Sequence, residues 1–215
     1  MASETRSRSP IRPWHVQVVA VVIVLVAVFF NVKVVSIADA TAASPDAFDP
    51  ASFAVDNYES EIVPQVEEDA VPLAALLTDL AAGADEADFG NSSGAASSYS
   101  FPVTFSGVAG TPNGGVVPIT VDGTPAGVTV QLQVGPALNG TALRDVTGTI
   151  SFDQFTNQLE YQQVGTELNN QVKATVLDSL DVASLAGKTV TVTGAYTRVN
   201  PALVSVVPVK LEVSP

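Results

Sequence analysis

The 215-residue sequence contains no cysteine and only one histidine, His15. Without cysteine the chain has no disulfide, no thiolate metal site, no catalytic thiol and no thiol that accepts a lipid. Because His15 lies beside a hydrophobic run near the N-terminus, the rest of the chain also lacks an imidazole for a Ser/His/Asp triad or a histidine metal site. We therefore expect a protein that is not an enzyme and that holds no metal and no cofactor.

Basic residues are scarce as well, with nine Lys and Arg against 22 Asp and Glu and a net charge of −13. Four of the bases fall within residues 1–33, so the body that follows is more acidic than the whole chain. Affinity for nucleic acid comes mainly from Lys and Arg that displace counterions from the phosphate backbone. The charge balance therefore excludes DNA and RNA as partners.

One long hydrophobic run lies near the N-terminus. The stretch from Val16 to Phe30 contains one polar residue and no charge, and it follows a basic tail over residues 1–15. This pattern predicts a single transmembrane helix over residues 16–38, with the bilayer as its partner, the N-terminus in the cytoplasm and the C-terminal domain extracytoplasmic. The alternative is a signal peptide cleaved at the small residues of 38–42, which would leave a secreted or periplasmic protein.

The rest of the chain divides by composition. Residues 39–65 are rich in Ala, Asp, Pro and Ser, which is typical of a linker that runs into irregular structure. Residues 66–215 form the predicted extracytoplasmic domain, and its first element is a helix over about residues 71–82. This helix is predicted from four leucines at helical spacing, namely Leu73, Leu76, Leu77 and Leu80.

Beyond residue 100 apolar residues alternate with polar ones, which is the period of β-strands. The alternation predicts strands at 101–106, 116–121, 128–134, 189–193 and 207–213, with residues 146–152 as a further candidate strand. A long helix is expected over about 153–177, with Asp153 as its N-cap. Three strands, a helix and two strands is the order of an OB-fold, so we expect an α+β protein with an OB-fold-like β-barrel over about residues 100–214. A mixed α+β sheet is the alternative.

Several short blocks resemble a known family. Val130–Pro136, Gly140–Asp145, Phe152–Gln158 and Leu185–Lys188 are similar to the signature of a bacterial family of predicted periplasmic lipoproteins of unknown function. The resemblance implies proximity to ABC-type sugar-uptake systems, beside which such proteins are often encoded, and it implies no catalytic residue. Many relatives carry a lipid-accepting cysteine, whereas this sequence has none. We therefore expect attachment through the hydrophobic helix itself, or no attachment.

A binding site is expected after the third predicted strand, where polar residues gather. The candidates are Asn139, Thr141, Arg144, Asp145, Asn157, Gln158 and Asn169. The planar guanidinium of Arg144 suits a carboxylate, a phosphate or paired sugar hydroxyls. The alternative is structural: Arg144 pairs with an acid such as Asp145, while the amides of Asn157 and Gln158 cap backbone groups.

Three functions remain open from the sequence. The first is a non-enzymatic, membrane-anchored extracytoplasmic protein that is accessory to an ABC-type sugar-uptake system and contacts its subunits. The second is a small-ligand binding or sensing module for a sugar or an anionic metabolite, with Arg144 and its polar neighbours as the site. The third is a hydrolase that uses carboxylates alone, although no spacing of Asp and Glu singles out the facing pair that such an enzyme needs.

Overall fold

The computed structural model describes residues 48–94 and 97–214. The predicted basic tail and transmembrane helix, residues 1–38, lie outside these ranges. Among the described residues, no helix combines the length and the apolar character that a membrane crossing requires.

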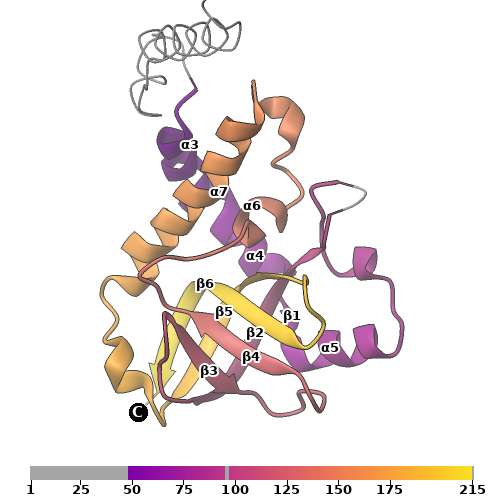
Figure 1. Cartoon of the computed structure of the whole chain (residues 1–215), viewed down its shortest axis with the longest axis vertical. Coiled ribbons are helices and arrows are strands. Elements are labelled where there is room, and N and C mark those ends of the chain that lie inside the picture. The colour runs from indigo at the N-terminus through magenta and orange to yellow at the C-terminus, as the bar shows by residue number, and fades with distance from the viewer. Residues whose placement is uncertain (1–47, 95–96, 215) are drawn as a thin grey trace, which may run out of the picture. The chain divides into compact units, whose positions relative to one another are not determined.

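Five strands close into a barrel (Figure 1). They are β2 (Ser100–Ala109), β3 (Val116–Thr120), β4 (Thr129–Gln133), β5 (Thr189–Thr197) and β6 (Leu203–Ser214). The strand order is β2-β3-β4-β6-β5, and β5 pairs back to β2. Strands β4 and β6 run parallel, whereas the other pairs of the barrel are antiparallel. This is the arrangement of an OB-fold, so the predicted α+β class and the OB-like order of the strands are confirmed.

The alternation of side chains fills the barrel interior. One apolar cluster contains Val117, Ile119, Val130, Leu132, Val192 and Val206, because successive side chains of a strand point to opposite faces of the sheet. Helix α5 (Leu73–Ala81) adds all four leucines of the predicted stripe to the same cluster. The two-residue strand β1 (Val71–Pro72) leads into this helix and pairs in parallel with β2.

The other α-helices and two π-helical turns lie outside the barrel. They are α3 (Pro50–Asn57), a π-helical turn at Tyr58–Ile62, α4 (Val63–Asp69), α6 (Ala142–Asp145) and α7 (Gln158–Val172), and a second π-helical turn at Lys173–Leu177 continues α7. Their apolar side chains form a second cluster with Ala195 of β5 and with Val207 and Val209 of β6. Figure 1 shows α3 and α7 packed side by side beyond the barrel.

The middle of strand β6, from Val206 to Val209, is consequently buried on both faces. Val206 belongs to the interior cluster, whereas its neighbour Val207 belongs to the cluster beneath the outer helices. Gly194 of β5 lies against this part of β6, and a Cβ at that position would overlap the carbonyl oxygen of Val207. The close approach of the two strands therefore requires glycine at this position.

The segment 39–65, expected to be a linker and irregular structure, is helical from Pro50 onward, so this prediction is wrong for its described part. Four residues at four-residue steps form a buried stripe, namely Ala54, Tyr58, Ile62 and Val66. The Oδ1 atom of Asp49 accepts the N–H of Ala51 at 3.0 Å and caps α3. Asp49 followed by Pro50 is thus the start signal of a helix, within a composition that favoured a linker.

The long helix predicted over 153–177 begins later than expected. Residues Phe152–Gln154 form a 3₁₀ turn, and α7 begins at Gln158 with Asn157 rather than Asp153 as its N-cap. Leu159, in the first turn of α7, is 47% exposed.

The candidate strand at 146–152 is a loop. Val146 and Ile150 are buried in the outer cluster, so their apolar character reflects packing against helices and not pairing with a strand.

Candidate functional site

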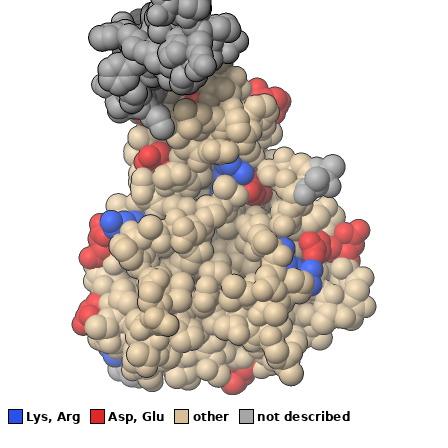
Figure 2. Space-filling view, in the orientation of Figure 1, with Lys and Arg blue, Asp and Glu red and all other residues tan. Residues whose placement is uncertain are grey.

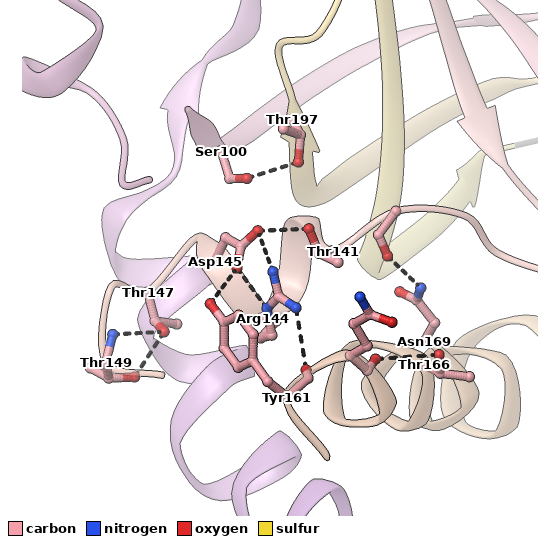
Figure 3. Close-up of polar contacts among 12 residues, drawn as sticks. Ser100, Thr141, Arg144, Asp145, Thr147, Thr149, Tyr161, Thr166, Asn169 and Thr197 are labelled. Atoms are coloured by element: carbon pink, nitrogen blue, oxygen red, sulfur yellow. Dashed lines mark hydrogen bonds and ion pairs between the residues drawn. The ribbon is translucent and has the colours of Figure 1, made fainter. Parts of the chain in front are cut away.

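Arg144, the predicted centre of the site, is buried on α6 and bound by its own neighbours (Figure 3). Its Nε donates to Oδ1 of Asp145 at 2.7 Å and its Nη2 donates to Oδ2 of the same carboxylate at 3.1 Å. Its Nη1 donates to the carbonyl oxygen of Tyr161 at 3.2 Å, and the guanidinium carbon lies 3.7 Å from the centroid of the Tyr161 ring. All three nitrogens of Arg144 are thus engaged within the protein.

Asp145 completes this buried network. Its carboxylate also accepts the hydroxyl of Thr141 at 2.6 Å and the hydroxyl of Tyr161 at 3.4 Å. Burial raises the pKa of Tyr161; the positive charge of Arg144 opposes the rise, and the negative charge of Asp145 adds to it. The network joins α6 to the first turns of α7, so the structure supports the structural alternative for Arg144 and Asp145.

The amides of Asn169 and Gln133 hold the loop that precedes α6. The Nδ2 atom of Asn169 donates to the carbonyl oxygen of Gly140 at 3.0 Å. The side chain of Gln133 binds both backbone groups of Asn139, since its Oε1 accepts the N–H at 2.7 Å and its Nε2 donates to the carbonyl at 3.2 Å. The Asn139 side chain itself is exposed and makes no hydrogen bond with the part of the chain that the structure describes.

Asn157 and Gln158, the other two predicted site residues, belong to the start of α7. The Oδ1 atom of Asn157 accepts the N–H groups of Leu159 and Glu160, each at 3.0 Å. Gln158 is exposed at the first residue of the helix. The first of these side chains is therefore a helix cap, as the structural alternative expected, and neither lies with Asn139.

A groove of about 330 Å³ opens beside the loop of Asn139. It lies between the end of β4, the loop before α6, the β5–β6 hairpin and the start of β6, and its lining residues are Gln133, Asn139, Gly140, Ala142, Thr197, Val199, Asn200, Leu203 and Ser205. Of the seven predicted site residues only Asn139 lines it. Sequence reasoning missed the hairpin and β6 residues because they are about sixty positions further along the chain.

The outer face of the barrel over β3 and β4 carries no charge. Asp122, in the turn between these strands, is the only charged residue in the sequence from 89 to 143. Figure 2 shows an uncharged surface over these strands with the charged side chains around its edges. This gap in an otherwise acidic sequence is the signal in the sequence that points to this face.

No metal centre emerges from the described residues, among which no three His, Asp or Glu side chains come together as ligands. The buried carboxylate of Asp145 is already paired with the guanidinium of Arg144.

Comparison with known proteins agrees with the fold. The model of a family described as "Predicted periplasmic lipoprotein (DUF2291)" matches residues 20–212. A crystal structure of an OB-fold protein from Thermotoga maritima is similar with a TM-score of 0.61 and 18% sequence identity, over 78% of this chain and 99% of that chain. A search of the curated proteins yields no match. At this identity the structural likeness shows the OB-fold and nothing about activity.

Proposed function

The chain belongs to this family of predicted periplasmic lipoproteins, and from that premise we propose that it is a non-enzymatic extracytoplasmic protein that assists an ABC-type sugar-uptake system through protein–protein contact. The family resemblance supplies the transporter as the partner. The uncharged outer face of β3 and β4 is the observation that supports a contact surface.

This face has the character of an interface core. The exposed strand residues Pro118, Thr120 and Thr129 are uncharged, in a chain whose net charge is −13. The cores of protein interfaces are depleted in charged residues, and OB-folds meet their ligands on this side of the barrel. A polyanionic partner does not fit the face, because it offers no Lys or Arg to neutralise phosphates.

Attachment to the membrane is part of the proposal. The family description speaks of a lipoprotein, but the sequence has no cysteine that could accept a lipid. The uncharged run from Val16 to Phe30, within the segment 16–38, supports a single-pass anchor with the N-terminus in the cytoplasm. Cleavage of this segment would instead release the domain outside the membrane, and the size of the mature protein by mass spectrometry distinguishes the two outcomes.

The second function considered from the sequence, binding of an anionic metabolite at Arg144, gains no support. A ligand that reached this guanidinium would have to displace Asp145 from a buried, bidentate ion pair. A neutral ligand would need a different set of residues.

The contact proposal is tested by crosslinking the full-length protein in native membranes and identifying its partners by mass spectrometry. Thr129→Lys places a charge on the face, and Thr166→Lys on α7 places the same charge away from it; both positions are exposed. We expect a permease or binding subunit to be crosslinked by the natural protein and by Thr166→Lys, and to be lost with Thr129→Lys. Recovery of no transporter subunit, or equal recovery with both variants, contradicts the proposal.

A further inference from the structure

The groove beside Asn139 is built from three separate parts of the chain. Gln133 and Asn139 come from β4 and the loop after it, Val199 and Asn200 from the β5–β6 hairpin, and Ser205 from the start of β6. Its volume of about 330 Å³ lies at the lower end of the range of roughly 300–1,000 Å³ that small-molecule sites occupy. This size fits a small metabolite rather than a polymer or a protein segment.

No charged residue lines the groove. Arg198, the basic residue of the β5–β6 hairpin, forms an ion pair with Glu86 and is not part of the lining. A carboxylate or phosphate that bound here would therefore lose its hydration without gaining a positively charged partner, and this desolvation costs free energy. The ligand that this lining favours is neutral.

Several polar groups of the lining are available to a ligand. The Asn139 side chain makes no hydrogen bond with the rest of the described chain, and Asn200 uses its Oδ1 for the N–H of Ala202 while its Nδ2 has no partner among the described residues. The Oγ atom of Ser205 accepts from Nε2 of Gln131 at 2.9 Å, which leaves its own O–H to donate. Amides and hydroxyls of this kind recognise hydroxyl groups.

Apolar groups make up most of the exposed surface of the groove. Val199 is 79% exposed at the tip of the hairpin, and Leu203 and Ala142 also line the groove. Such side chains suit the C–H face of a ring, whereas the amides suit its hydroxyl edge.

The loop that carries Asn139 is held in place from beneath. The side chain of Gln133 binds the backbone N–H and carbonyl of Asn139. The side-chain amide of the buried Asn169 donates to the carbonyl of Gly140. The ion pair of Arg144 and Asp145 fixes the helix that follows. A site whose polar groups are positioned before binding loses less entropy when a ligand arrives.

We infer that this groove binds a neutral, hydroxyl-rich small molecule of monosaccharide size, with hydroxyls on Asn139, Asn200 and Ser205 and a C–H face on Val199 and Leu203. This site goes beyond the protein contact proposed above and does not depend on it. The buried network around Arg144 acts on the site as a support for its loop.

Calorimetric titration of the full-length protein in detergent tests this inference. The probes are the D-aldopentoses, the D-aldohexoses, mannitol and myo-inositol, with glucose 6-phosphate and D-glucuronate as charged counterparts. We expect at least one neutral probe to bind, and Asn139→Ala to weaken that binding roughly tenfold through the loss of its hydrogen bonds. Asn170→Ala, an exposed amide on α7, is the matched control and should leave binding unchanged.

The inference is overturned if no neutral probe binds at about 1 mM, the concentration that half-saturates a site with a Kd of about 1 mM. It is also overturned if a charged counterpart binds more tightly than its neutral parent, or if Asn139→Ala binds as well as the natural protein. Measuring both variants in both experiments separates the two proposals. Asn139→Ala should still be crosslinked to the transporter subunit, and Thr129→Lys should still bind the ligand.

Discussion

Both backbone polar groups of Asn139 are bound by the side-chain amide of one residue, Gln133, at 2.7 Å and 3.2 Å. Gln133 is the last residue of β4 and is only 7% exposed, so a rigid strand of the barrel holds a surface loop. The barrel therefore fixes the position of Asn139, although this residue lies in a surface loop.

Replacement of Gln133 by Leu should release this loop. The variant leaves the N–H and the carbonyl of Asn139 without their partner and should cost about 1–2 kcal/mol of unfolding free energy. Amide hydrogen exchange at Asn139 should become faster. Gln131→Leu on the same strand, which loses only the bond to Ser205, is the control and should leave that exchange rate unaltered.

Removal of either partner of the buried ion pair should be strongly destabilising. Arg144→Ala leaves the Asp145 carboxylate buried without its counter-charge, and Asp145→Ala does the same to Arg144, so each should cost about 3–5 kcal/mol in urea unfolding. The double variant with Leu at both positions should cost less than the sum of the two single losses, because no unpaired charge remains. A single-variant loss below about 1 kcal/mol, typical of exposed pairs, would show that the pair is open to solvent.

Asn157 and Gln158 form an adjacent pair for comparison. Asn157→Ala removes the cap of α7 and should lower the unfolding free energy by about 1 kcal/mol. Gln158→Ala, at an exposed helical position, should change it by less than about 0.5 kcal/mol. Thermal unfolding of both variants, with the ligand titration repeated on each, checks that Asn157 serves the helix and not the binding of a ligand.

Stability should fall at high pH because of Tyr196. Burial raises the pKa of Tyr196 to about 12, and its hydroxyl has no hydrogen-bond partner among the described residues. The folded state favours the neutral phenol, so its contribution is complete below the unfolded pKa of about 10 and is lost as the pH rises toward about 12. Burial also raises the pKa values of Tyr58 and Tyr161, so the comparison must be between variants.

Tyr196→Phe isolates this effect. The variant should be at least as stable as the natural protein at neutral pH, because it removes an unpaired buried hydroxyl. Between pH of about 10 and about 11.5 it should lose less stability than the natural protein, by about 1–2 kcal/mol. Equal losses in urea unfolding would show that Tyr196 does not titrate in this way.

Much of the fold was predictable because its signals are local. Alternation along β3 and β4, and the leucine stripe of α5, depend only on which side chains of one element face the core. The helical stripe through Ala54, Tyr58, Ile62 and Val66 was equally local, but the Ala-, Asp- and Pro-rich composition around it indicated a linker. That error came from weighting composition above periodicity.

The role of the predicted site residues depends on contacts with residues that are distant in the sequence. In the sequence, Arg144 is a rare base next to an acid, and such a pair is compatible with a ligand site as well as with an ion pair. Tyr161, seventeen positions later, lies against the guanidinium and helps to bury it. Only this packing distinguishes the two interpretations.

The sequence by itself determined the class of the fold and the order of the strands, since these follow from periodicity. Only the tertiary structure decided that the middle of β6 is covered on both faces, that Arg144 is enclosed, and that Asn139, Asn200 and Ser205 line one groove. The reason is physical: burial and proximity are set by contacts between residues far apart in the chain, and neither composition nor spacing along the sequence contains that information.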